Sequence, residues 1–122
     1  MFDTISIIGC GLIGSSMLRA IKSKDLAKKI KVFDRSKEVA TYLKKENICT
    51  NISNDIRQCA DNSDLIIIAT PLSSYKEIIL SIKDSLKKNV ILTDTGSVKK
   101  EVMKIIHNIN LKDVHWISSH PI

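Results

Sequence analysis

Three glycines near the N-terminus have the spacing of a phosphate-binding loop. Residues 9–14, GCGLIG, match the pattern GxGxxG and directly follow the apolar run 5–8. In such a loop Gly9 permits a tight turn, Gly11 lets a pyrophosphate approach the backbone, and Gly14 lets the next helix pack closely on the strand. The free N–H groups and the positive end of that helix dipole then face the phosphates. The motif by itself is weak evidence, because a glycine-rich turn without a ligand has the same pattern.

An acidic residue stands where the second half of a dinucleotide pattern needs one. Asp34 comes 20 residues after Gly14, at the end of a second predicted strand over 31–34. A carboxylate there accepts hydrogen bonds from ribose hydroxyls and repels a 2′-phosphate, which favours NAD. Arg35 follows directly and leaves NADP as the less favoured choice, since a guanidinium stacks on adenine or attracts that phosphate. The sequence therefore predicts a dinucleotide site that also includes Leu12 and Ile13 of the loop.

Buried strands and amphipathic helices alternate along the chain and position this site. Apolar runs predict strands at 5–8, 31–34, around Ile48, and at 65–69, 90–93 and 115–118. Apolar stripes with helical spacing begin near residues 12, 39, 56, 75 and 98, and Ser36 is suited to cap the second of these helices. Residues 65–69 are apolar at every position, as in a central parallel strand covered on both faces. We expect one α/β domain over 1–122, a doubly wound, mostly parallel sheet of the Rossmann type.

Composition and charge exclude several other classes of protein. The net charge of +6 comes from scattered lysines, and aromatic residues make up only 4% of the chain. Nucleic-acid surfaces concentrate their charge and use arginine or stacking aromatics, so we expect small anionic ligands and no nucleic acid. We expect no membrane span, because no apolar run approaches the roughly 20 residues needed to cross a bilayer. Without a basic leader at the N-terminus, a cytoplasmic location is expected.

The cysteines indicate a reducing compartment and no metal site. Cys10, Cys49 and Cys59 are odd in number and have neither a CxxC pattern nor metal-ligand spacing. Cys49 and Cys59 are expected to be small core or edge residues. Cys10 occupies a variable position of the glycine loop, and no redox role is expected for it.

Five segments together resemble a known family. The segments GCGLIGSS, VFDRS, DLIIIATP, TDTGSVK and SSHPI occur in this order over essentially the whole chain. In order and spacing they are similar to the N-terminal domain of prephenate dehydrogenase and its arogenate-using relatives. The TDTGSVK turn and the later His-Pro-Ile are the specific part of the resemblance, because many dehydrogenases share the glycine loop.

The resemblance implies an oxidative decarboxylation in tyrosine biosynthesis that converts prephenate to 4-hydroxyphenylpyruvate. Hydride passes from a cyclohexadienol ring to NAD, carbon dioxide leaves, and the ring becomes aromatic. By motif position, His120 is the catalytic histidine, and a neutral imidazole suits a base that takes the ring hydroxyl proton. Ser97 orients that histidine or touches the same hydroxyl, and it also suits the N-cap of the last predicted helix. Thr70 and Pro71 are expected to line the nicotinamide site.

In the family a mostly helical second domain follows, and we expect this chain to lack it. That domain supplies much of the homodimer interface and the basic groups that hold the substrate's carboxylates. The chain by itself is therefore expected to bind NAD and to turn over prephenate poorly or not at all. The alternatives are an arogenate dehydrogenase, a β-hydroxyacid dehydrogenase or imine reductase, and a non-catalytic dinucleotide-binding module that senses redox state. Ser97 and His120 count against the last alternative, because a pure binder needs neither.

Overall fold

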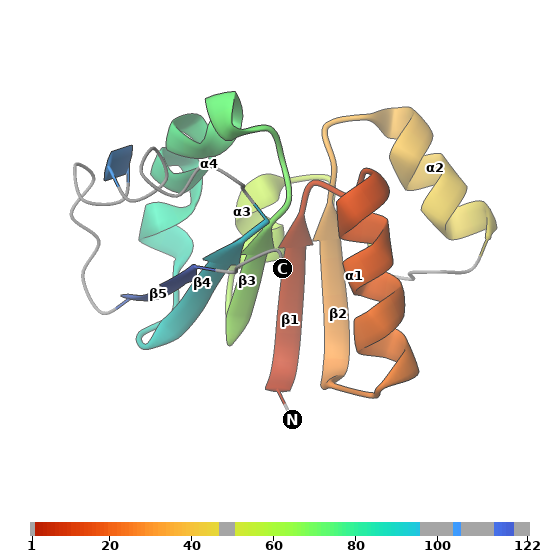
Figure 1. The fold of residues 1–122 in the computed structure, drawn as a ribbon, viewed down its shortest axis with the longest axis horizontal. Helices are drawn as coiled ribbons and strands as arrows, with labels where there is room; N and C mark the ends of the chain where they lie inside the picture. The colour runs from red at the N-terminus through yellow and green to blue at the C-terminus, as the bar shows by residue number, and fades with distance from the viewer. Residues whose placement is uncertain (1, 47–50, 96–103, 106–113, 119–122) are drawn as a thin grey trace.

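The strands of the chain form one parallel sheet. A computed structural model describes residues 2–46, 51–95, 104–105 and 114–118. In this part of the chain five parallel strands are arranged in the order β2-β1-β3-β4-β5 (Figure 1). They are β1 (Phe2–Ile8), β2 (Ala27–Phe33), β3 (Leu65–Ile68), β4 (Val90–Asp94) and β5 (Val114–Ser118). The chain starts in the middle of the sheet, builds outward to β2, and then crosses to β3 on the other side of β1. This topology confirms the predicted doubly wound fold, whose ligand site lies where the strand order reverses.

Helices connect the strands and cover both faces of the sheet. They are α1 (Leu12–Ser23), α2 (Lys37–Lys45), α3 (Ile56–Ala60) and α4 (Tyr75–Ile82), and short 3₁₀ turns, η1 (Leu72–Ser74) and η2 (Lys83–Ser85), flank α4. In β3, Ile66 and Ile68 pack in the core under α3 and α4, whereas Ile67 packs in the core under α1 and α2. Burial on both faces explains why this strand is apolar at every position.

Next to the third predicted strand, the described residues form a single parallel bridge. The prediction placed this strand around Ile48, which lies outside the described residues. Just beyond, Ile52 forms an isolated parallel bridge with Val32 of β2. Two backbone hydrogen bonds flank it, from the Val32 N–H to the Asn51 carbonyl at 2.9 Å and from the Ser53 N–H to the Val32 carbonyl at 2.8 Å. The described residues beside Ile52, namely Asn51, Ser53 and Asn54, are polar.

The other predicted elements differ from the structure mainly at their ends. β2 begins earlier than predicted and ends at Phe33, so that Asp34 is the first residue after the strand. The helix predicted from residue 75 ends at Ile82 and passes into the turn η2. Of the helix predicted from residue 98, only 104–105 are described, and both are helical. Cys59 is buried in the core as predicted, whereas Cys49 lies outside the described residues. Within the described ranges, no helix has the length and apolar character needed to span a membrane.

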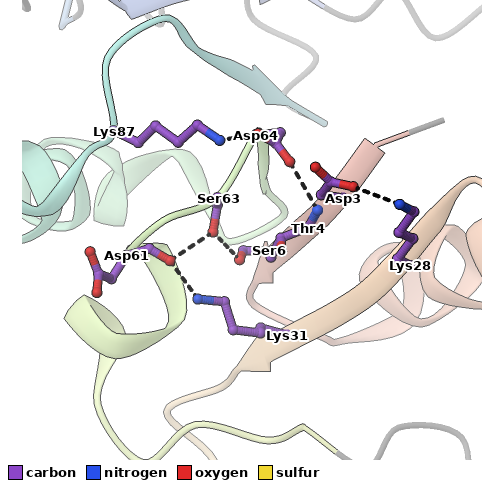
Figure 2. Close-up of polar contacts among 9 residues, drawn as sticks. All are labelled: Asp3, Thr4, Ser6, Lys28, Lys31, Asp61, Ser63, Asp64 and Lys87. Carbon is purple, nitrogen blue, oxygen red and sulfur yellow. Dashed lines mark hydrogen bonds and ion pairs between the residues drawn. The ribbon is translucent and has the colours of Figure 1, made fainter.

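A polar network ties the amino ends of three strands together (Figure 2). Asp64, directly before β3, accepts a hydrogen bond from the Thr4 N–H of β1 at 3.0 Å. Its other carboxylate oxygen pairs with the ammonium of Lys87, which precedes β4. Next to this pair, the buried hydroxyls of Ser6 and Ser63 lie 2.6 Å apart. These contacts fix how the chain enters β3 and β4, at the edge opposite the glycine loop.

Candidate functional site

Two glycines of the loop are required by the packing of the protein itself. Gly9 has a φ of +88°, which L side chains rarely adopt, and a Cβ atom there would lie 2.6 Å from Cγ2 of Thr70. A Cβ atom at Gly14 would overlap the carbonyl oxygen of Gly9. The loop therefore presses closely on the start of α1 and on the segment that follows β3.

Gly11 is different, because nothing in the described protein requires a glycine there. A Cβ atom at Gly11 would meet no atom within 4 Å, and its φ is −72°. The residue is exposed, so the space beside its backbone is open. The protein's own packing therefore does not explain why residue 11 is a glycine. A ligand that approaches this backbone closely, as a pyrophosphate does, explains it.

The N-terminus of α1 lacks the caps that the next two helices have. In α2 the Ser36 hydroxyl accepts the Val39 N–H, and in α3 the Asp55 carboxylate accepts the Arg57 N–H. By contrast, α1 begins after Gly11 with no side-chain cap and no acidic residue in its first turn. The first N–H groups of a helix need an acceptor, and the helix dipole favours an anion at this end. Leu12 and Ile13 belong to this turn by their backbone, whereas their side chains are not among those described.

Asp34 connects the glycine loop to the start of α2. Its Oδ2 accepts the Cys10 N–H at 2.7 Å, and its Oδ1 accepts the Ser36 N–H at 2.8 Å. Each carboxylate oxygen has a second acceptor position, and Asp34 lines an open cavity, so the group still has capacity for hydroxyl donors. The prediction treated Asp34 only as a ligand group and missed this second role. No sequence signal identifies the partner, since every residue except proline offers a backbone N–H.

A cavity of about 540 Å³ brings most of the predicted residues together. This volume is in the range of sites for small organic ligands. The predicted residues on its walls are Gly9, Gly11, Asp34, Arg35, Thr70 and Pro71. Gly14 does not line the cavity, and it packs against Gly9 of the cavity wall.

One wall of the cavity comes from a helix that the sequence prediction did not include in the site. Ser74 at the N-cap of α4, and Glu77, Ile78 and Ser81 within the helix, line the same cavity as the glycine loop. They repeat at helical spacing on one face of α4, and the crossover from β1 to β3 brings this helix beside the loop. An available signal is that α4 begins soon after Thr70 and Pro71, which the sequence predicts at the nicotinamide site.

The two predicted catalytic residues, Ser97 and His120, lie outside the described residues. The strands that precede them, β4 and β5, run parallel to β1 and end at the same edge of the sheet as the cavity. At the end of β4, Asp94 is buried, and the Tyr75 hydroxyl donates to its Oδ2 over 3.4 Å. This contact links the start of α4 to the end of β4.

Comparisons with known proteins agree with this geometry. A family model described as "Prephenate dehydrogenase, nucleotide-binding domain" matches residues 17–122. Cyclohexadienyl dehydrogenase of Zymomonas mobilis subsp. mobilis is 34% identical over 122 residues, which are 100% of this chain and 41% of that protein. The chain thus spans about two fifths of the length of this curated relative, and the alignment includes the glycine loop that precedes the family-model match.

Solved structures show that the fold is shared more widely. Prephenate dehydrogenase from Aquifex aeolicus, in complex with hydroxyphenyl propionate and NAD+, superposes with a TM-score of 0.84 at 22% identity, over 100% of this chain and 42% of that one. A 3-hydroxyisobutyrate dehydrogenase of Mycobacterium tuberculosis has a TM-score of 0.85 at 11% identity, over 98% of this chain and 40% of that one. Fold alone therefore does not separate these two classes, whereas the sequence match does. The chain belongs to the prephenate dehydrogenase family, and the matched region is the nucleotide-binding domain of that family.

Proposed function

We propose that this chain binds NAD as the nucleotide-binding part of a dehydrogenase that oxidises prephenate. The observation that carries the proposal is one cavity that joins the open backbone of Gly11 to the carboxylate of Asp34. An uncapped helix N-terminus lies beside Gly11, and Asp34 keeps acceptor capacity after its two backbone hydrogen bonds. A dinucleotide needs a phosphate site and a ribose site next to each other, and the described residues provide both.

The chain's own residues hold the two halves of the dinucleotide. The backbone around Gly9 and Gly11 and the first turn of α1 hold the pyrophosphate. Asp34 accepts the ribose hydroxyls and disfavours a 2′-phosphate, which makes NAD the preferred cofactor over NADP, while Thr70 and Pro71 border the nicotinamide side. When bound, NAD supplies the hydride acceptor of the reaction.

The proposed chemistry places one proton transfer on this chain. As the hydride leaves the carbinol carbon, His120 takes the proton of the ring hydroxyl, and that oxygen becomes a carbonyl. Ser97 orients the imidazole or touches the same hydroxyl. Loss of carbon dioxide then gives the aromatic ring of 4-hydroxyphenylpyruvate, a step of tyrosine biosynthesis that we place in the cytoplasm.

The chain by itself is proposed to bind the cofactor without efficient turnover. It spans 41% of the Zymomonas relative, and groups that hold the substrate's carboxylates belong to a further domain in this proposal. The same domain would build the homodimer. Arogenate is the second candidate substrate, because that relative is named for cyclohexadienyl substrates and not for prephenate alone.

Calorimetric titration with NAD and NADP tests the binding step directly. We expect saturable binding of NAD, and weaker binding of NADP. NADH formation with prephenate or arogenate is then measured for this chain and for a protein in which it is joined to a substrate domain. A joined protein that binds NAD and oxidises neither substrate would contradict the enzyme proposal and favour a non-catalytic NAD-binding module. A joined protein that keeps its full rate after His120→Asn would contradict the role of His120.

A further inference from the structure

The cavity extends beyond the residues that hold phosphate and ribose. Gly9 and Gly11 mark its phosphate end, and Asp34 marks the ribose position. In the adenosine half of NAD the base follows the ribose, so it must occupy the part of the cavity beyond Asp34. The cavity walls include Phe33, Ile56 and Ile78, which pack in one apolar cluster and suit a flat aromatic ring.

A carboxylate on α4 lines the same cavity as this apolar cluster. Glu77 lines the cavity together with Ile78 and with Ser81 one turn later. The Ser81 hydroxyl donates its hydrogen to the Glu77 carbonyl at 2.8 Å, so this donor is already used. The Glu77 carboxylate is exposed and makes no hydrogen bond or ion pair with any other residue that the structure describes. This wall therefore presents a charged acceptor with full capacity for a ligand.

The chemistry of an ionised carboxylate decides which base it prefers. A carboxylate accepts hydrogen bonds and donates none. The exocyclic amine of adenine is a donor, whereas hypoxanthine carries a carbonyl oxygen at the same ring position. We infer that Glu77 accepts a hydrogen bond from the exocyclic amine of adenine and makes the site selective for adenine dinucleotides. The inference rests on the proposed function, because it concerns the adenosine end of the same site.

NAD and nicotinamide hypoxanthine dinucleotide are the probes that separate this inference from a merely apolar pocket. The two cofactors differ only in the base, and calorimetry gives the ratio of their dissociation constants for each variant. We expect the wild-type chain to prefer NAD by about tenfold, the effect of one hydrogen bond to a charged acceptor. In Glu77→Ala the ratio should fall to about one, because the acceptor is gone. In Glu77→Gln the ratio should be intermediate, since an amide can also donate to the hypoxanthine carbonyl.

A matched control variant tests whether the cofactor preference depends on the Glu77 side chain itself or on the net charge of the protein. Glu46, at the end of α2, is exposed and lies outside this cavity, and Glu46→Ala removes the same side chain and the same charge. This variant should keep the wild-type ratio, and circular dichroism should show that all variants are folded. Equal binding of both cofactors by the wild type, or an unchanged ratio in Glu77→Ala, overturns the inference and leaves NAD binding intact. Failure of the wild type to bind NAD at all overturns the proposed function, and the inference with it.

Discussion

Two aspartates at opposite edges of the sheet hold β1 by the same kind of contact. At the carboxyl edge, Asp34 accepts the Cys10 N–H, just after β1 ends, at 2.7 Å. At the amino edge, Asp64 accepts the Thr4 N–H, near the start of β1, at 3.0 Å. Both contacts fix the chain at an end of the central strand. From the residue types alone the two sites would be judged equivalent.

The surroundings of the two carboxylates make the difference. Asp64 also pairs with the ammonium of Lys87, so its charge is balanced within the fold (Figure 2). Asp34 is bound by N–H groups and makes no ion pair within the described ranges, and it lines the cavity beside Gly11. A carboxylate that keeps its charge and faces a cavity is available to a ligand, whereas one paired with a lysine stabilises the fold.

Removal of the Asp34 carboxylate should have the largest effect on binding. In Asp34→Ala, NAD affinity measured by calorimetry should fall by about 100-fold, because two hydrogen bonds to a charged acceptor are lost. The free energy of unfolding should also decrease by about 1–2 kcal/mol, since the Cys10 and Ser36 N–H groups lose their acceptor. Asp64→Ala is the matched control at the other edge and should leave NAD affinity unchanged. An unchanged affinity in Asp34→Ala would show that the ribose is held elsewhere.

A methyl group at Gly11 should weaken NAD binding and leave the stability of the protein nearly unchanged. In Gly11→Ala we expect NAD affinity to fall by about tenfold or more, because the methyl group occupies the space beside the backbone that the pyrophosphate approaches. The free energy of unfolding should change by less than about 1 kcal/mol, because the new atom meets nothing within 4 Å. Urea unfolding and calorimetry on the same sample measure the two quantities. Gly14→Ala is the contrasting variant: it should destabilise the protein, because its Cβ atom overlaps the Gly9 carbonyl. Equal loss of stability in both variants would contradict a ligand role for Gly11.

The sheet and half of the site could be predicted because their signals are local. The run 65–69 is apolar at every position, and the glycine spacing and Asp34 lie in a fixed relation along the chain. The strand near Ile48 rests on a weaker signal, a few apolar residues among polar ones, and it stays a prediction beside the described bridge at Ile52. Local pattern therefore predicts those elements whose burial is nearly complete.

The rest depends on contacts between distant residues. Asp64 and Thr4 are separated by 60 positions, and neither residue type by itself indicates a structural hydrogen bond. Glu77 has the sequence surroundings of an ordinary exposed helix residue, and only the crossover of the chain brings it to the cavity. Such roles depend on the topology, which sets where helices lie relative to loops. The fold therefore has to be known before these residues can be assigned a role.

Removal of the Asp64 carboxylate should reduce stability and leave binding intact. At neutral pH, Asp64→Ala should lower the free energy of unfolding by about 1 kcal/mol, a small value because the Lys87 pair is partly exposed and screened. The hydrogen bond from Lys87, followed by the Thr4 N–H, lowers the pKa of Asp64 in the folded protein. A lowered pKa means that this stabilisation is complete above the ordinary value of about 3.9 and is lost as the pH falls through the folded-state pKa. Urea unfolding at neutral pH and near pH 2 should therefore show the difference between wild type and variant shrinking in acid. A difference that grows in acid would contradict the assignment.

Loss of the Asp3 charge should have the smallest effect on the free energy of unfolding. This variant shows whether negative charge at the amino edge stabilises the protein by itself, or only where the carboxylate binds the β1 backbone. Asp3 pairs with Lys28 at 3.3 Å on the same edge of the sheet, but the side chains of both residues are more than two thirds exposed, at 76% and 70%. Because exposed ion pairs are screened by water and salt, Asp3→Asn should change the free energy of unfolding by less than about 0.5 kcal/mol. The same urea titration that measures Asp64→Ala measures this variant. If Asp3→Asn cost as much as Asp64→Ala, negative charge at this edge would matter more than a carboxylate bound to the β1 backbone. In that case, net negative charge at each edge would explain the difference between Asp34 and Asp64. The hydrogen bonds from the β1 end to these carboxylates would no longer account for the stability of either edge.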